Sequence, residues 1–428
     1  MTRGRALLAS ALVAGAVVAT GPAAYAVEDA ECDQGSLDET FSTSRDSGPV
    51  PEMDLDRAHE WLARHGETPG AGVVVAVVDS GVGAPDGIRV VESPVVVPGL
   101  QREYYHGTAV AGLVAGAARV ADSGGTVGVA PGAQVLDLQV YDDPSGANGT
   151  PILTANVVAA LDVVLARRAA GMNVRVVNIS LNVAPDDALA QRVEQLWEAG
   201  VVTVASTGNR PRNDPGDTGS ALVPDEQYGE FRPGENARDV VHPAAYDPVV
   251  GVNASMAGTD GADPHEYVLE NSATDLAAPT SGAVSYTVNG GTCLLSTPAT
   301  SWAAAEVSGV LAMLFAHFPE DTPAMAVSRL LLTADGRADM PDRLAGAGDV
   351  QAYDALTRPL ALDEDGTAQQ TSPEPDRQVY AAPEPEPDVL ASTRHDAVWW
   401  GLLGGGALLL ALVLRPVLSR RAGSRSGR

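Results

Sequence analysis

Several short, continuous runs of apolar residues constrain the fold of this chain most strongly. The first run, Val73–Val78, contains only valine and alanine, which is typical of a parallel strand buried on both faces. Similar runs occur at residues 133–140, 174–179, 201–205 and 249–252. Stretches of helical character lie at residues 152–170, 186–199, 301–318 and 324–333. This alternation predicts an α/β domain with a mostly parallel sheet flanked by helices.

The N-terminus has the three parts of a secretory signal peptide. A basic start, Met1–Arg5, precedes an apolar run to Thr20, and alanines at positions 24 and 26 form a cleavage site. A first transmembrane helix is the alternative, but the apolar run is short for that role. We therefore predict a signal peptide over residues 1–26. Residues 27–54 are acidic and polar, and we expect an N-terminal extension without a core of its own.

The C-terminal part of the chain predicts a membrane anchor. Residues 359–396 are rich in proline and acidic residues and are expected to form an extended linker. Residues 397–414 are uncharged and apolar, and as a helix they would span about 27 Å, enough for the hydrocarbon core of a bilayer. The tail, residues 415–428, is basic and is therefore predicted to be cytoplasmic. We expect a single-pass protein of the cell membrane whose folded domain is extracytoplasmic.

Two polar segments follow the pattern of functional groups in open α/β sheets. Asp79 ends the first apolar run and precedes Ser80 and Gly81, at the carboxyl end of the predicted strand. A turn aspartate that caps the next segment is the alternative interpretation. His106 begins a run of small residues, which predicts a helix that packs closely against its neighbours. For this residue the alternative is a helix-capping or buried histidine.

Two further segments carry an amide and a hydroxyl. Gly208 and Asn209 follow the run at 201–205, and the amide N–H₂ of Asn209 is suited to stabilise a developing oxyanion. An ordinary turn asparagine is equally compatible with this position. Ser301 precedes a long apolar helix, where a serine is commonly an N-cap. The same position also exposes the hydroxyl to the positive end of the helix dipole.

Taken in order, these four segments resemble the motifs of the subtilisin-like serine proteases, the peptidase S8 family. The chain order Asp, His, Ser is that family's order. The resemblance covers residues 55–358 and implies a three-layer subtilisin-like fold for this protease domain. It implies a catalytic triad of Asp79, His106 and Ser301, with Asn209 as the oxyanion donor. It also implies that the substrate cleft is lined by Ser180, Leu181, Asn182 and Gly208, and that residues 274–279 form a loop before the nucleophile.

The sequence departs from the family pattern at three positions. Ala299 stands where glycine is usual, and its methyl group is expected to crowd the backbone near the oxyanion site. Ala305 stands where proline is usual, and Glu306 where histidine or tyrosine is common. The departures leave the triad intact, but they predict weaker or narrower activity.

The overall layout resembles the mycosins, which are membrane-anchored subtilases associated with type VII secretion systems. This resemblance implies protein or peptide substrates and a secretion membrane complex as a partner. The first predicted function is a serine endopeptidase that acts on exported proteins. The alternative is a structural subunit of a secretion complex with weak or dispensable protease activity. A generic, anchored degradative protease is a third possibility.

Cysteine content and charge set further bounds. Cys32 and Cys293 are too few for a metal site, but in an exported protein they can form a disulfide that ties the extension to the chain before Ser301. Two unpaired, buried thiols are the alternative. The net charge of −28 argues against a nucleic-acid partner. The implied chemistry requires no cofactor, and no run of acidic residues identifies a calcium site. Residues 210–241 are polar and form either a substrate-guiding or a merely tolerated insertion.

Overall fold

The computed structural model describes residues 30–34, 42–83, 86–117, 125–211, 223–369 and 390–422. The chain forms two compact units, Met1–Gln370 and Thr371–Arg428. The predicted signal peptide, residues 1–26, lies outside the described residues, as do most of the predicted linker and the end of the basic tail.

The first unit is built on a parallel sheet of seven strands. The strands are β1 (Val74–Asp79), β2 (Val90–Glu92), β3 (Gln134–Gln139), β4 (Val174–Ile179), β5 (Val202–Ser206), β6 (Val250–Ser255) and β7 (Leu276–Pro279). Their order across the sheet is β2-β3-β1-β4-β5-β6-β7. The apolar runs of the sequence form β1, β3, β4, β5 and β6, as predicted. The expectation of a loop at residues 274–279 was wrong, because Leu276–Pro279 pairs with β6 and forms the edge of the sheet.

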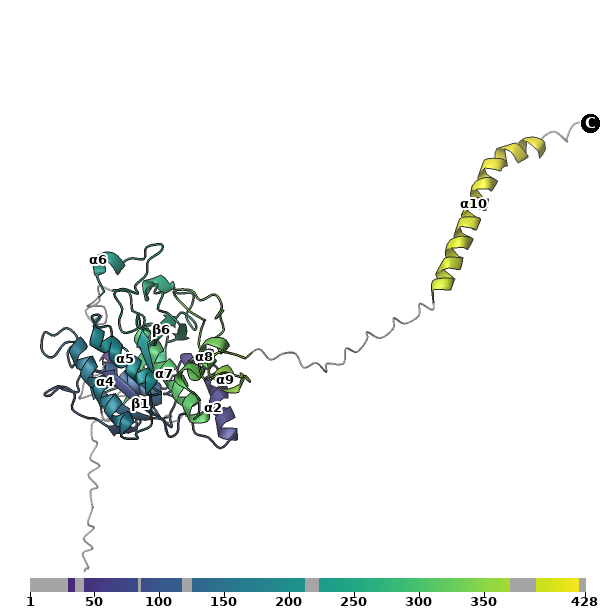
Figure 1. The fold of residues 1–428 in the computed structure, drawn as a ribbon. Helices are drawn as coiled ribbons and strands as arrows, with labels where there is room; N and C mark the ends of the chain where they lie inside the picture. Colours follow the sequence, from purple (N-terminus) through teal and green to yellow (C-terminus); the bar gives the residue numbers. More distant parts are fainter. Residues whose placement is uncertain are drawn as a thin grey trace, which may run out of the picture. The chain divides into compact units, whose positions relative to one another are not determined.

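Helices cover both faces of the sheet and make three layers (Figure 1). Side chains alternate along β1, so that Val75 and Val77 contribute to one hydrophobic core while Ala76 and Val78 contribute to the other. The first core also contains residues of α2 (Leu55–Arg64), α3 (His106–Ala115), α7 (Thr300–His317), α8 (Pro323–Thr333) and α9 (Ala352–Thr357). The second contains residues of α4 (Thr154–Ala169) and α5 (Asp187–Glu198). The predicted subtilisin-like three-layer architecture is confirmed.

Helix α7 is the central helix of the first core. All of its residues from Thr300 to Phe315 are buried, and the helix is apolar around its whole circumference, which is the pattern of a fully enclosed helix. It packs against α3 and against strands β4, β5 and β6. The helix begins at Thr300, so Ser301 lies in its first turn, inside the domain.

The N-terminal extension packs on the protease domain. The 3₁₀ helix η1 (Cys32–Gln34) lies beside β9 (Thr292–Leu295), which pairs with β8 (Ala283–Tyr286) in an antiparallel hairpin. The backbone N–H of Leu294 donates to the carbonyl of Ala30 at 3.0 Å. Further along the extension, α1 (Pro49–Glu52) and Met53 close the first core. The extension therefore uses the core of the domain, in agreement with its lack of a core of its own.

The second unit contains one long helix, α10 (Ala391–Ala422). The part from Ser392 to Pro416 is long and apolar enough to cross a membrane. The helix at the predicted span, residues 397–414, is thus confirmed, and it extends beyond that span in both directions. The first unit also reaches further than the predicted start of the linker at residue 359, because Thr322 Oγ1 donates to the carbonyl of Glu364 at 2.7 Å.

Candidate active site

Asp79 ends β1 near the middle of the sheet, where its side chain is fully buried. Its Oδ1 accepts hydrogen bonds from the backbone N–H of Ser80 at 2.7 Å and from Tyr141 Oη at 3.2 Å. Both oxygens face the His106 ring, with Nδ1 at 2.9 Å from Oδ1 and 3.0 Å from Oδ2. Three neighbouring groups thus fix the orientation of this carboxylate toward His106.

His106 reaches Asp79 because α3 begins in direct contact with the backbone that follows β1. A Cβ atom on Gly107 would lie 2.6 Å from the carbonyl oxygen of Gly81, so only glycine permits this approach. The predicted helix with small residues is confirmed, and His106 is its first residue. Since Nδ1 donates to a carboxylate, the proton is placed on Nδ1 and Nε2 is left as the basic nitrogen. The side chain is 14% exposed, in contrast to Asp79.

Ser301 is the second residue of α7, so the predicted alternative of an N-cap serine was wrong, and Ala299 occupies the cap position. The Ser301 hydroxyl donates to the carbonyl of Ser180 at 3.3 Å, and Ser180 Oγ donates to the carbonyl of Ser301 at 2.8 Å. Asn178 of β4 in turn donates to Ser180 Oγ at 2.9 Å. These bonds connect the start of α7 to the carboxyl end of β4.

Asn209 lies just beyond β5, and its orientation follows from its partners. The backbone N–H of Thr300 lies 2.8 Å from Asn209 Oδ1, and Thr300 Oγ1 lies 3.0 Å from the same atom. A backbone N–H only donates, so the atom facing it must be the amide oxygen. The N–H₂ group of Asn209 is therefore directed away from Thr300 and is the end of the amide that acts as a donor.

One cavity of ≈ 260 Å³ joins these groups. His106, Asn209 and Ser301 line it, and Asp79 lies directly behind His106. The four residues predicted to bind substrate, namely Ser180, Leu181, Asn182 and Gly208, line the same cavity. Aromatic side chains that we did not predict complete the wall, and the Trp302 ring lies 4.8 Å from the His106 ring. The structure thus brings together the residues that the sequence motifs selected.

Tyr141 is the residue at this site that sequence reasoning missed. It follows β3, which is the strand next to β1, and it is 1% exposed. Burial raises the pKa of its hydroxyl well above the ordinary value, and the negative charge of Asp79 adds to this effect. Tyr141 therefore remains a neutral hydrogen-bond donor to Asp79. The one available signal was its position immediately after a predicted strand, where side chains reach the carboxyl edge of the sheet.

Of the three departures from the family motif, Ala299 has an ordinary backbone. Its φ of −152° and ψ of 143° are extended values that any residue adopts, so the methyl group requires no strained conformation there. The expectation that its methyl group crowds the backbone near the oxyanion site stays a prediction. Ala305 is completely buried in α7.

Glu306, by contrast, is a buried acid in the apolar interior. It is 1% exposed, and no group in the described part of the chain lies within hydrogen-bond reach of its Oε2. Burial raises the pKa of Glu306 well above its usual range, and the charge of Asp349 acts in the same direction. The pKa of Asp349 is itself raised to about 6, chiefly by burial.

This arrangement predicts a stability that falls with rising pH. A carboxyl with a raised folded-state pKa stabilises the fold below its unfolded pKa and loses that contribution as the pH rises toward the folded value. We expect Glu306→Gln to have little effect at pH 5 and to raise the melting temperature at pH 8. The gain in the free energy of unfolding should be on the order of 1 kcal/mol for each pH unit above about 4.5. Thermal unfolding at the two pH values measures this. The exposed Glu194→Gln should show no such pH-dependent difference, and an equal effect of both substitutions would contradict the prediction.

The cysteines form the predicted disulfide. Cys32 in η1 is bonded to Cys293 in β9, with the two Cα atoms 4.9 Å apart. The neighbouring Glu31 accepts a hydrogen bond from the backbone N–H of Ser296 at 3.1 Å. Asp33, on the other side of Cys32, lines the cavity. The bond therefore holds part of the extension at the wall of the candidate active site.

Comparisons with known proteins agree with this geometry. The model of the subtilase family matches residues 70–348. Mycosin-1 of Mycobacterium tuberculosis (strain ATCC 25618 / H37Rv) is 32% identical over 319 residues, which cover 67% of this chain and 69% of that protein. The structure of "MycP3 protease from the type VII (ESX-3) secretion system" matches with a TM-score of 0.55 at 26% identity, over 77% of this chain and 92% of that one.

The chain therefore belongs to the subtilase family of serine proteases. Within that family it is related to the mycosins. A chain of "an intact ESX-5 inner membrane complex" matches over 90% of this chain and 93% of its own length, with a TM-score of 0.55. At 22% identity this last match shows a common fold.

Proposed function

We propose that the protein is a membrane-anchored serine endopeptidase that hydrolyses peptide bonds of exported proteins. The observation that carries the proposal is the buried Asp79–His106 pair beside a cavity that also contains Ser301 and Asn209. A carboxylate that orients a histidine next to a serine is the arrangement that activates a hydroxyl for acyl transfer.

The proposed mechanism assigns one role to each of these side chains. Asp79 keeps the proton of His106 on Nδ1, so that Nε2 accepts the proton of Ser301 as Ser301 attacks the peptide carbonyl. The Ser301 hydroxyl turns away from the Ser180 carbonyl when substrate arrives. The Asn209 N–H₂ group and the backbone N–H of Ser301, near the positive end of α7, stabilise the oxyanion. His106 then gives the proton to the leaving amine as the C–N bond breaks, which leaves an ester on Ser301. A water molecule, deprotonated by His106, attacks this ester, and the acid product and the free Ser301 hydroxyl are released, so that the sequence requires no cofactor.

The test is covalent labelling of full-length protein with a fluorophosphonate, which reacts with activated serines. We expect the parent to be labelled and Ser301→Ala to remain unlabelled. His106→Ala should also fail to react, because its serine has no base. Labelling of Ser301→Ala to the level of the parent would overturn the proposal, since the reactive group would then be elsewhere.

Tyr141 is expected to assist Asp79 in this reaction. In Tyr141→Phe the carboxylate loses one donor, which is worth about 1.5 kcal/mol for a hydrogen bond to a charged group and corresponds to about a tenfold loss in kcat/KM. Because Tyr141 helps to fix the carboxylate that orients His106, the loss in kcat/KM should appear over the whole pH range. The measurement is kcat/KM against pH, with thermal unfolding as the control for folding. An unchanged kcat/KM would contradict the role.

The membrane orientation is the second part of the proposal. The predicted signal peptide and the basic tail, residues 415–428, both support an extracytoplasmic protease and a cytoplasmic tail. A membrane-impermeant maleimide applied to intact cells should label Ser145→Cys in the protease domain and spare Ser419→Cys. The reverse pattern would contradict this orientation.

A structural role in a secretion complex is the second candidate function. It is supported by the similarity to mycosins and by the common fold with a chain of an intact ESX-5 inner membrane complex. Complementation of a deletion strain separates the two functions. If Ser301→Ala restores secretion fully, the contribution to secretion is structural. If Ser301→Ala fails while the protein accumulates normally, proteolysis is the function that matters there.

A further inference from the structure

Arg210, the residue after Asn209, is a buried arginine in a segment that reads as a polar insertion. The residue is 3% exposed, and its ion-pair partner Glu235 has a side chain that is 4% exposed. The prediction that residues 210–241 form a surface insertion therefore does not hold for Arg210, which is buried. Burying an ion pair costs desolvation, and apolar residues of similar size often stabilise a fold as well. A gain in folding stability therefore does not explain why this ion pair is buried.

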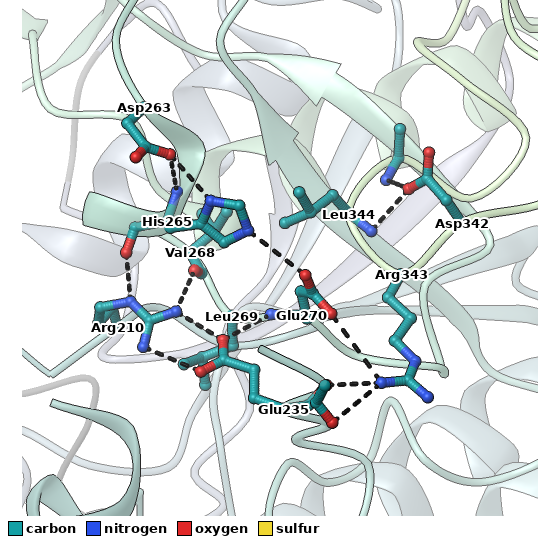
Figure 2. A network of polar contacts seen from close by, with 12 residues as sticks. Arg210, Glu235, Asp263, His265, Val268, Leu269, Glu270, Asp342, Arg343 and Leu344 are labelled. Carbon is teal, nitrogen blue, oxygen red and sulfur yellow. Dashed lines mark hydrogen bonds and ion pairs between the residues drawn. The ribbon is translucent and has the colours of Figure 1, made fainter. Parts of the chain in front are cut away.

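The guanidinium of Arg210 is fully committed to protein acceptors (Figure 2). Its five N–H groups are matched by five hydrogen bonds, and Nε donates to the carbonyl of His265. The first terminal nitrogen donates to the carbonyl of Tyr228 at 2.8 Å and to Glu235 at 3.2 Å. The second donates to Glu235 at 2.5 Å and to the carbonyl of Val268 at 3.3 Å. No N–H is left for a substrate. Arg210 also lines the cavity, but its side chain offers no N–H to a substrate and therefore acts on its surroundings.

These bonds fix the backbone on both sides of Asn209. The Arg210 N–H donates to the carbonyl of Tyr267 at 2.8 Å, and Asn209 forms an isolated β-bridge with Val268. Glu235 also accepts from the backbone N–H of Glu270 at 3.1 Å, so one carboxylate joins Arg210 to the segment opposite. The segment around Tyr267, which lines the cavity, is thus joined to the segment that carries Asn209 both by these backbone contacts and by the Arg210 side chain, which bonds the carbonyls of His265 and Val268.

An outer layer of charged side chains supports this core. His265 interacts through Nδ1 with Asp263 at 2.9 Å and through Nε2 with Glu270 at 3.4 Å. Arg343 donates to the backbone carbonyl of Glu235 at 2.7 Å and lies 3.9 Å from the Glu270 carboxylate. Figure 2 shows these contacts continuing outward from the Arg210–Glu235 pair. The layer restrains the acceptors to which Arg210 is bound.

We infer that Arg210, held by Glu235, is a positioning residue that sets the place of Asn209 and thereby the oxyanion site. The inference rests on the proposed role of Asn209 as oxyanion donor. Oxyanion donors act only over a narrow range of distance, and a misplacement of about 1 Å reduces rates by about 10²-fold. Lysine retains the charge but lacks the planar array of five donors, so it cannot hold the same five acceptors.

The test is a double-mutant cycle in the full-length protein, measured with a chromogenic peptide p-nitroanilide. We expect Arg210→Lys to lower kcat about 10- to 100-fold and to change KM less than threefold. Because Arg210 acts through Asn209, Arg210→Lys should have little further effect in an Asn209→Ala background. The matched control is Arg329→Lys, which disturbs another buried Arg–Asp pair, with Asp321, remote from the cavity.

The outcomes separate cleanly. Independent, multiplicative losses in the double mutant would overturn the inference, as would a loss in Arg210→Lys no larger than in Arg329→Lys. If Arg210→Lys fails to fold, Glu235→Gln replaces it, because it removes one charged acceptor and keeps the side-chain shape. That variant should show the same loss confined to kcat and dependent on Asn209, and a normal kcat would overturn the inference. Turnover by Ser301→Ala equal to that of the parent would instead refute the proposed function itself.

Discussion

Alanine at Ser301 should lower kcat for peptide hydrolysis by about 10⁶-fold, the scale that loss of the triad serine has in subtilisin, a member of the same family. Ser301 lies with His106 in the cavity at the start of α7, whereas Ser180, which also lines the cavity, donates its hydroxyl to the carbonyl of Ser301. Asp79→Ala should be less severe, about 10⁴-fold, since the remaining His106 still acts as a base without being oriented. Initial rates on a peptide p-nitroanilide measure both.

The control for this comparison is Ser328→Ala on α8, which removes a serine hydroxyl away from the cavity and should retain the parent rate. The double variant of Asp79 and Ser301 should be no slower than Ser301→Ala alone, because the triad acts as a unit. Equal, small losses in all single variants would show that another mechanism carries the hydrolysis.

Loss of the Cys32–Cys293 disulfide should produce the largest change in stability. The bond joins residues separated by 261 positions, and a chain-entropy estimate for so long a loop is about 5 kcal/mol, an upper value for this model of disulfides. We expect a Cys32→Ser, Cys293→Ser double variant to unfold at lower denaturant concentration, with a loss of about 2–5 kcal/mol. Urea unfolding of the oxidised parent, the reduced parent and the double variant measures this.

The reduced parent and the double variant should agree, because both lack the same crosslink. A loss below about 1 kcal/mol would mean that the hydrogen bonds of Ala30 and Glu31 to the β9 region hold the extension by themselves. Because Asp33 lines the cavity, release of the extension should also change KM for peptide substrates more than kcat. This second readout distinguishes a local change at the cavity from general loss of folded protein.

Much of the site could be predicted because its signals are local. The apolar run before Asp79 and the small residues after His106 place each side chain at a strand or helix end by rules that need only neighbouring residues. The order of the motifs along the chain then indicated that they belong to one active site. Ser301 was ambiguous by such rules, since an N-cap and a first-turn residue differ by only two positions.

Arg210, Tyr141 and Glu306 could not be predicted, because their roles depend on contacts between distant segments. Arg210 reads as the first residue of a polar loop, and only the approach of the segments near Glu235 and His265 buries it. Tyr141 reaches Asp79 because β3 and β1 are neighbours, which the sequence order of the strands does not reveal. Glu306 could be recognised only as a departure from the family motif, and its burial follows from the enclosure of α7 on all sides.

The bond between Thr300 and Asn209 has a further consequence for how this enzyme can change. Ala299, at the cap position of α7, has no side-chain acceptor, and Asn209, from the segment that follows β5, supplies one to the first N–H of the helix. In the proposed mechanism, one amide therefore serves folding with its oxygen and catalysis with its nitrogen. Aspartate at position 209 would still accept the hydrogen bond from the Thr300 N–H but could not donate to the oxyanion, while alanine could do neither. Selection for stability and selection for turnover thus converge on asparagine at this position, and if proteolysis becomes dispensable, aspartate still meets the folding requirement while alanine does not.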